Sequence, residues 1–142
     1  MSELKRGKVY FLDGEYERAL EVFYDAAADG DAEGAFDYAF CHQFGYGTVV
    51  DYRTAVSFYK FAAVRVPEAN YNLAVIYMMG LGVSRDYRVA YEYMRDAAAA
   101  GVVEAQLYLG VALYGNCLYA GYNCRLYDTV SYPHPARSLT NA

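Results

Sequence analysis

The sequence predicts an all-α fold, a superhelical α/α solenoid of antiparallel helix pairs, and three observations support this prediction. Alanine and tyrosine dominate the composition while proline occurs only three times, a balance that favours helices over proline-punctuated β-structure. Apolar residues recur with helical spacing, and paired glycines separate consecutive periodic segments. The whole pattern returns at intervals of roughly 35 residues, which is typical of helical-repeat proteins. We expect three full helix pairs followed by an incomplete fourth pair.

The overall composition limits the classes of partner. The chain has 142 residues, enough for a sizeable core within one domain, and a formal net charge of -5. Lysine is scarce and the arginines are scattered, so no basic stripe follows the chain and nucleic-acid binding is not expected. No apolar stretch reaches the roughly 18 residues of a membrane span, so a membrane partner is not expected either.

The N-terminus and the cysteines indicate the compartment. The opening stretch MSELKRGKVYFLDGEYERAL lacks the apolar region and the small-residue cleavage site of a secretion signal. Cys41, Cys117 and Cys124 form neither an even set nor a metal-binding spacing. We therefore expect a cytoplasmic protein. Whether Cys117 and Cys124 pair or remain free thiols is open at this stage.

The third repeat contains the clearest helix pair. Its first helix is expected at about residues 68–79 and its second at about 86–100. Ala74 and Ala90 are small enough to let the two helices approach closely. The expected core faces consist of Ala69, Leu73, Ala74 and Tyr77 on the first helix, and of Val89, Ala90, Tyr93, Met94, Ala97 and Ala98 on the second.

Glycine and aspartate mark the connection between the two helices. Gly80 and Gly82 stand at the end of the first helix, where a left-handed cap is easily adopted by glycine. Asp86 suits the start of the second helix because its carboxylate can accept the free backbone N–H groups there. Gly101 closes the second helix. The preceding repeat has the same pattern at Gly45, Gly47 and Asp51.

The segment EANYNLAVIYMMGLGVSRDYRVAYEYMRDAAAAG, residues 68–101, resembles a Sel1-like repeat, a relative of the tetratricopeptide repeat. Ala74 stands where that family usually has glycine. Residues 33–66 resemble the same repeat, with His42 in place of a tyrosine and Thr48 in place of a valine. The matching positions in the first segment are Ala69, Leu73, Tyr77, Gly80, Gly82, Val83, Asp86, Ala90, Tyr93, Met94, Ala97, Ala98 and Gly101.

The resemblance divides the chain into unequal repeats. The first repeat lacks the glycine loop, and the last one decays before Pro133, because proline cannot continue a helix. We expect a tetratricopeptide-like first repeat at 1–32, Sel1-like repeats at 33–67 and 68–103, a degenerate capping repeat at 104–132 and a tail at 133–142.

Residues with catalytic or ligand-binding potential are few. His42 occupies a core tyrosine position, where a packed and hydrogen-bonded histidine is expected, and His134 lies between two prolines of the tail. The loops GYGTVV and GLGVSR lack the lysine of a phosphate loop. The segment DGDAEG begins like a calcium loop, but Phe40 stands where a glutamate is needed, so an acid-rich turn is expected. We therefore expect no enzyme activity, no cofactor and no metal.

The resemblance also implies a role. Proteins with Sel1-like repeats mostly act as adaptors, so we expect a non-catalytic scaffold that binds a peptide or protein segment in a concave groove. Two alternatives remain open: a homo-oligomeric structural module that associates through its aromatic C-terminal end, and a regulatory subunit of an enzyme complex. The oligomeric state is not predicted.

The expected groove runs along the first helices of successive repeats. Phe40, Val75 and Val111 stand at matching positions, turned roughly 200° from the core tyrosine position. With acidic residues beside them, the groove would suit a peptide with an apolar anchor and basic flanks. Packing of these three residues against the preceding repeat is the alternative. The predicted partner-binding residues are Asp37, Phe40, Phe44, Glu68, Asn72, Val75, Met79, Glu104, Tyr108 and Val111.

Overall fold

The computed structural model describes residues 2–110, and every regular element in this range is a helix. The predicted all-α class is therefore confirmed. The chain divides into two compact units, one up to Ala69 and one from Asn70 onward, and each is described by itself. The helices are α1 (Glu3–Leu12), α2 (Tyr16–Ala28), α3 (Ala32–Phe44), α4 (Tyr52–Ala62), α5 (Pro67–Met79) and α6 (Tyr87–Ala99). Residues 103–110 are also helical.

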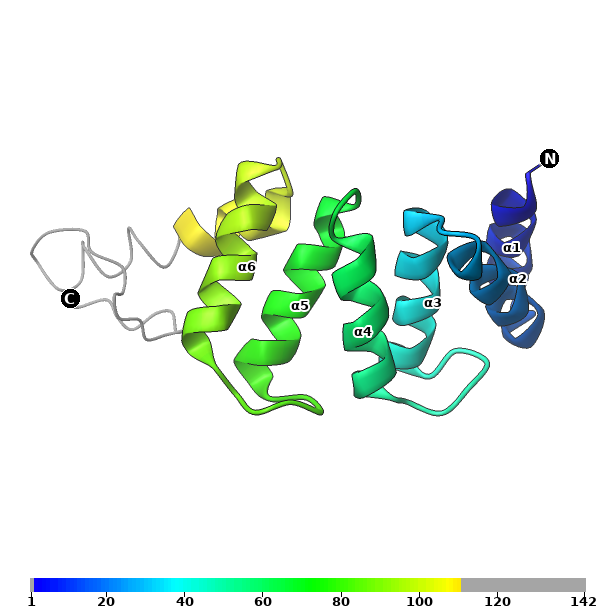
Figure 1. Ribbon diagram of the computed structural model, residues 1–142, viewed down its shortest axis with the longest axis horizontal. Helices are drawn as coiled ribbons and strands as arrows, with labels where there is room; N and C mark the ends of the chain where they lie inside the picture. The colour runs from blue at the N-terminus through cyan, green and yellow to red at the C-terminus, as the bar shows by residue number, and fades with distance from the viewer. Residues whose placement is uncertain (1, 111–142) are drawn as a thin grey trace, which may run out of the picture. The chain divides into compact units, whose positions relative to one another are not determined.

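The first unit contains two antiparallel helix pairs, α1 with α2 and α3 with α4 (Figure 1). Helix α2 also packs against α3, so the two pairs are in contact. Ala19, Phe23 and Cys41 form a buried cluster across these helices. The buried Tyr59 hydroxyl on α4 donates a hydrogen bond to Gln43 Oε1 on α3 at 2.6 Å, which satisfies two polar groups in the core.

Aspartates begin three of the helices. The Asp31 Oδ1 atom accepts hydrogen bonds from the backbone N–H groups of Glu33 at 2.9 Å and Gly34 at 3.3 Å. Asp51 and Asp86 accept equivalent bonds at the starts of α4 and α6. A cap of this kind contributes about 1 kcal/mol to helix stability. The predicted caps are confirmed, and the acidic segment around Asp31 is a turn that begins a helix.

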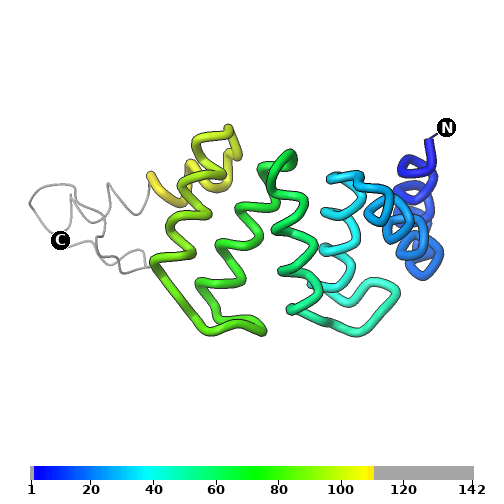
Figure 2. The backbone as a smooth tube through the Cα atoms, viewed as in Figure 1, coloured from blue at the N-terminus to red at the C-terminus, as the bar shows by residue number. Residues whose placement is uncertain are grey.

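The two glycine loops adopt the predicted left-handed conformation. Gly45 and Gly47 have φ angles of 77°, and Gly80 and Gly82 have φ angles of 69°. The first repeat instead reverses at Gly14, with φ of 83°, which confirms that it lacks this loop. Figure 2 shows the wide excursion of the chain between α3 and α4 beside the tight turn between α1 and α2.

Gly47 is expected to tolerate no side chain. A Cβ atom there would lie 2.7 Å from the backbone oxygen and 2.8 Å from the carbonyl carbon of Tyr16, at a φ of 77°. Replacing Gly47 with alanine should lower the free energy of unfolding by about 2–4 kcal/mol, because the backbone at the start of α2 must shift. Gly30 is the matched control: its φ is 92°, and apart from Gly30 itself and its two chain neighbours, no residue of the described chain has an atom within 4 Å of its Cβ position. Gly30→Ala should lower the free energy of unfolding by only about 1 kcal/mol. Equal losses for the two variants in urea denaturation would contradict the predicted clash at Gly47.

The second unit contains α5 from Asn70 onward and α6, and residues 103–110 pack against this pair. The rings of Tyr77 and Tyr93 stack between the two helices with centroids 5.8 Å apart. Gly101 follows α6 with φ of 100°, as predicted for the residue that closes this helix. One buried cluster of the unit consists of Ala74, Met94, Ala97, Val102 and Ala105.

His42 is packed in the core as predicted, but the expected hydrogen bond is not found. Its ring lies 4.6 Å from that of Tyr38 in a T-shaped contact. Neither ring nitrogen has a hydrogen-bond partner among residues 2–110. Burial lowers the pKa of His42, so the neutral imidazole is favoured in the folded chain.

Several predictions concern residues outside the described range. They include the capping repeat beyond residue 110, the tail at 133–142 and the groove position Val111. Cys117, Cys124 and His134 lie outside it as well. These predictions stay as they were made from the sequence.

Candidate functional site

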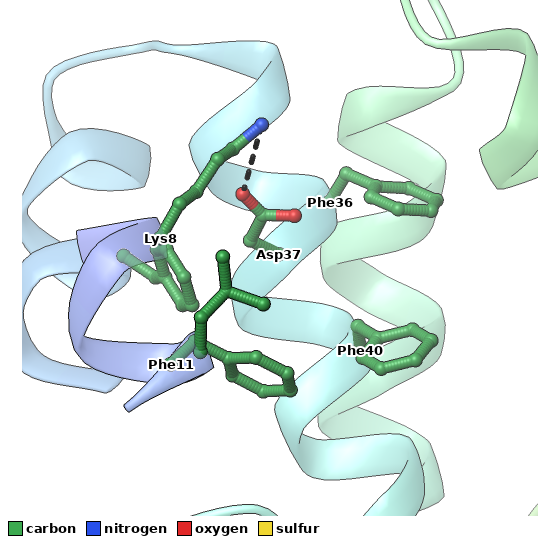
Figure 3. Close-up of a pocket in the computed structure, with 7 residues that line it drawn as sticks. Lys8, Phe11, Phe36, Asp37 and Phe40 are labelled. Atoms are coloured by element: carbon green, nitrogen blue, oxygen red, sulfur yellow. Dashed lines mark ion pairs between the residues drawn. The ribbon is translucent and has the colours of Figure 1, made fainter. Parts of the chain in front are cut away.

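A pocket opens between α1 and α3 in the first unit (Figure 3). Its volume is about 300 Å³, at the lower end of the range for ligand pockets, so its size suits one large side chain. We refer to it as the α1–α3 pocket. It is lined by Lys8, Phe11 and Leu12 of α1, Phe23 of α2, and Phe36, Asp37 and Phe40 of α3.

Aromatic rings from three helices form most of its wall. The Phe11 ring centroid lies 6.4 Å from that of Phe40 and 6.5 Å from that of Phe23. Phe36 and Phe40 are one turn apart on α3, with centroids separated by 6.5 Å. Tyr46 of the glycine loop supports Phe40 from outside the pocket, with its ring nearly parallel at 6.0 Å. Such contacts hold the rings in defined orientations, so the apolar wall is preformed.

One side of the pocket carries charged groups. Lys8 Nζ donates a hydrogen bond to Glu33 Oε2 at 2.8 Å and lies 3.8 Å from Asp37 Oδ2, the ion pair drawn in Figure 3. The Asp37 Oδ2 atom is buried and has no hydrogen-bond partner in the described chain. Burial raises the pKa of Asp37 to about 6, against the lowering effect of Lys8 and with further raising by Glu33 and Asp31. A buried carboxylate oxygen without a hydrogen bond costs stability, and such groups concentrate at functional sites.

The structure brings part of the predicted groove together at this pocket. Asp37 and Phe40 line it. Phe44 is 53% exposed and its ring lies 4.7 Å from that of Phe40. Phe40 also contacts Phe11 of the preceding repeat, which is the packing alternative that the sequence left open, and its role in partner binding stays a prediction.

The other predicted positions lie on later helices. Glu68 lies in the first turn of α5 and is exposed, and Met79 ends the same helix with 61% exposure. The intermediate positions on α5 are half-buried. No contact described here assigns a binding role to these residues, and they remain predictions. They are Glu68, Asn72, Val75 and Met79 on α5, and Glu104 and Tyr108 in the segment 103–110.

Sequence reasoning missed the contribution of α1. The loop of the first repeat is shorter, and once the repeats are aligned with this in mind, Lys8 stands at the position of Phe40 and Leu12 at that of Phe44. Leu12 is 83% exposed at the rim of the pocket. The sequence therefore contained this information, because the predicted groove positions on α3 have counterparts on α1 in the first repeat.

The arrangement offers recognition through an apolar cavity beside a carboxylate. Burial raises the pKa of the nearby Cys41 thiol to about 12, so its thiolate is scarce at neutral pH. Within the described range, no three histidine, cysteine, aspartate or glutamate side chains are placed to hold a metal ion.

The helix pairs, glycine loops and aspartate caps define a helical-repeat protein. Residues 32–63 and 67–102 match the Sel1 repeat. The chain therefore belongs to the Sel1-repeat family, as the resemblance implied. Proteins of this family generally mediate protein–protein interactions.

Two solved structures are similar to this chain. A Sel1 repeat protein from Oxalobacter formigenes is 25% identical with a TM-score of 0.73, and the match covers 88% of this chain and 50% of that one. A protective antigen from uropathogenic Escherichia coli strains, which displays an SLR fold, is 24% identical with a TM-score of 0.71. That match covers 84% of this chain and 28% of the antigen chain. The chain thus spans half or less of the length of these relatives.

The search of curated proteins finds no match. Among the described helices, none has the length and apolar character needed to cross a membrane.

Proposed function

We propose that this chain is a non-catalytic interaction module that binds a segment of a partner protein at the α1–α3 pocket. The observation that carries this proposal is the preformed aromatic cavity, which opens on the surface of a repeat whose family generally mediates protein–protein interactions. The size of the cavity favours one apolar anchor residue from the partner.

The rim of the pocket supports an apolar anchor. Leu12 is 83% exposed, so its side chain is largely in contact with water in the free chain. A partner side chain that enters the pocket would remove water from Leu12 and from the aromatic wall at once. Burial of one large apolar side chain contributes about 1.5–3 kcal/mol, enough to anchor a segment that makes further contacts.

The surroundings of the pocket favour basic flanks on the bound segment. The carboxylates of Asp31, Glu33 and Asp37 outnumber the Lys8 ammonium that lies among them. Opposite charge on a partner would speed association and fix the register of binding. Val75 and Met79, which stand at the positions of Phe40 and Phe44 in the next repeat, are proposed as contacts of that repeat with its own part of a segment.

A rim substitution tests the proposal. Peptides selected on the wild-type chain from a displayed library of random short sequences should share an apolar residue. Leu12→Asp should lower the retention of these peptides about tenfold, because a charged rim opposes entry of the anchor. Val64→Asp is the matched control, since Val64 is also 83% exposed but does not line the pocket.

The results for the two variants distinguish binding at the α1–α3 pocket from binding at another surface. Both variants should keep wild-type helicity, because both side chains are exposed. If Leu12→Asp retains the selected peptides as well as Val64→Asp does, the α1–α3 pocket is not the binding surface. Self-association of the wild-type chain that Leu12→Asp leaves intact would instead support the homo-oligomeric alternative.

A further inference from the structure

Asp37 has an unfilled hydrogen-bonding position at the α1–α3 pocket. An ionised carboxylate has about four acceptor sites on its two oxygens. The buried Oδ2 atom accepts no hydrogen bond within residues 2–110. Lys8 Nζ, at 3.8 Å, is beyond hydrogen-bond distance and contributes attraction by charge alone. A donor brought by a ligand would complete this site.

Lys8 occupies the entrance but bonds elsewhere. Its hydrogen bond goes to Glu33 at 2.8 Å, on the exposed side of the pocket. The Lys8 side chain is 42% exposed, and its flexible stem can turn outward with Glu33, whose side chain is 56% exposed. Displacing the Lys8 ammonium from Asp37 therefore breaks no hydrogen bond between these two residues.

The local charge selects a cation over a neutral donor. Asp31 and Glu33 act on Asp37 as like charges, and Lys8 acts on it as an opposite charge. A guanidinium group suits this carboxylate especially well, because it is planar, remains charged and donates several hydrogen bonds from one fork.

We propose that the bound segment carries an arginine next to its apolar anchor, and that the arginine donates to Asp37 while Lys8 turns outward. This inference rests on the proposed binding of a protein segment at the α1–α3 pocket. Phe36 and Phe40, which line the pocket, would receive the anchor, and Asp37, which follows Phe36 on α3 and faces Lys8 of α1, would receive the guanidinium. Lys8 then acts as a specificity-determining competitor within the chain.

Two small probes test the charge requirement without a known partner. Phenethylguanidinium offers a ring and a cation, and phenethylurea is its neutral counterpart. Each is titrated into the full-length, ¹⁵N-labelled chain while the backbone amides of α1 and α3 are followed by NMR. We expect the guanidinium probe to bind about tenfold more tightly than the urea, because hydrogen bonds between charged groups are stronger.

Three variants assign the preference. Asp37→Asn should bind both probes equally, whereas Asp25→Asn, which removes an exposed carboxylate on α2, should keep the preference. Lys8→Gln should bind the guanidinium probe several-fold more tightly, because the internal competitor is gone. A preference that survives in Asp37→Asn, or weaker guanidinium binding by Lys8→Gln, would overturn the inference.

Failure of this inference is distinct from failure of the proposed function. Equal binding of the two probes to the wild-type chain would reject the arginine while keeping the apolar pocket. Absence of binding by either probe would reject the arginine at this site, and the Leu12→Asp selection decides the pocket independently.

Discussion

Replacing Gly34 with leucine is expected to lower the free energy of unfolding by about 3 kcal/mol or more. Gly34 lies in the first turn of α3, buried against α2. A Cβ atom there would lie 2.5 Å from the Cβ of Ala26 and 3.2 Å from backbone atoms of Ala26 and Ala27. A leucine would direct three further carbon atoms into this contact, so α2 and α3 would have to separate.

The neighbours of Gly34 are what make the cost large. The Cβ of Ala26 is fixed to its backbone and cannot rotate away from an added atom. At Gly7 a Cβ would approach Val22 Cγ1 at 2.8 Å and Phe23 Cε1 at 2.9 Å, which are atoms at the ends of side chains, and Val22 Cβ at 3.1 Å. The closest contact is therefore less tight than at Gly34, and more of it can move. Both glycines lie within helices, so alanine would gain about 1 kcal/mol of helix propensity at either position.

Urea denaturation followed by circular dichroism measures the difference. Gly7→Ala should destabilise less than Gly34→Ala, and Gly34→Leu should destabilise most. This order follows from how far each clashing neighbour can move. A Gly34→Leu variant as stable as the wild-type chain would show that the contact between α2 and α3 is looser than described.

The loops and caps could be predicted from the sequence because their causes are local. Gly80 and Gly82 were identified from a backbone conformation that glycine adopts easily, and Asp86 from the hydrogen bonds that a carboxylate can accept from the free backbone N–H groups at a helix start. Each of these features depends on residues within one turn of the chain. The recurrence at Gly45 and Asp51 then predicted the same geometry in a second repeat, and the structure confirms it.

The full extent of the core could not be predicted in the same way. Cys41 and Ile76 occupy the same position in successive repeats and both are completely buried, yet neither belonged to the predicted apolar faces. A single apolar stripe describes a helix with one packed side. Helix α3 packs against both α2 and α4, so it buries more of its circumference. The sequence alone did not indicate which helices have two neighbours.

The candidate site depended on contacts between repeats. Asp37 and Phe40 were predicted from their place on α3, but Lys8 lies 25 residues before Glu33, to which it donates. No local pattern connects such residues, and the shorter loop of the first repeat concealed the alignment. The burial of the Asp37 Oδ2 atom likewise depends on contacts between helices of the first unit, which only the structure shows.

Asp37→Asn is expected to stabilise the chain at pH 8 by up to about 3 kcal/mol. The pKa of Asp37 is raised by burial from 3.8 to about 6, so the folded state binds this proton more tightly than the unfolded state does. The stability that protonated Asp37 contributes to the folded state is fully present below about pH 4 and is lost as the pH rises through about 6. Asparagine is neutral throughout and has a similar shape, so the variant does not suffer this loss.

The contribution of His42 to stability depends on pH in the opposite direction. Burial lowers its pKa in the folded state, so the unfolded state binds this proton more tightly. Its contribution to stability is present above the unfolded value of about 6.5 and is lost as the pH falls below it. In the wild-type chain, acidification from pH 8 to pH 5 therefore combines a gain from Asp37 with a loss from His42.

The variant should separate these two contributions. Thermal unfolding between pH 5 and 8 should show a shallow dependence on pH for the wild-type chain and a steeper loss on acidification for Asp37→Asn. Asp25→Asn, which removes an exposed carboxylate from α2, should follow the wild-type curve. An Asp37→Asn curve parallel to the wild-type curve would mean that Asp37 titrates as a solvated carboxylate. Stabilisation at pH 8 together with lost preference for the guanidinium probe would identify Asp37 as a group retained for recognition at a cost to stability.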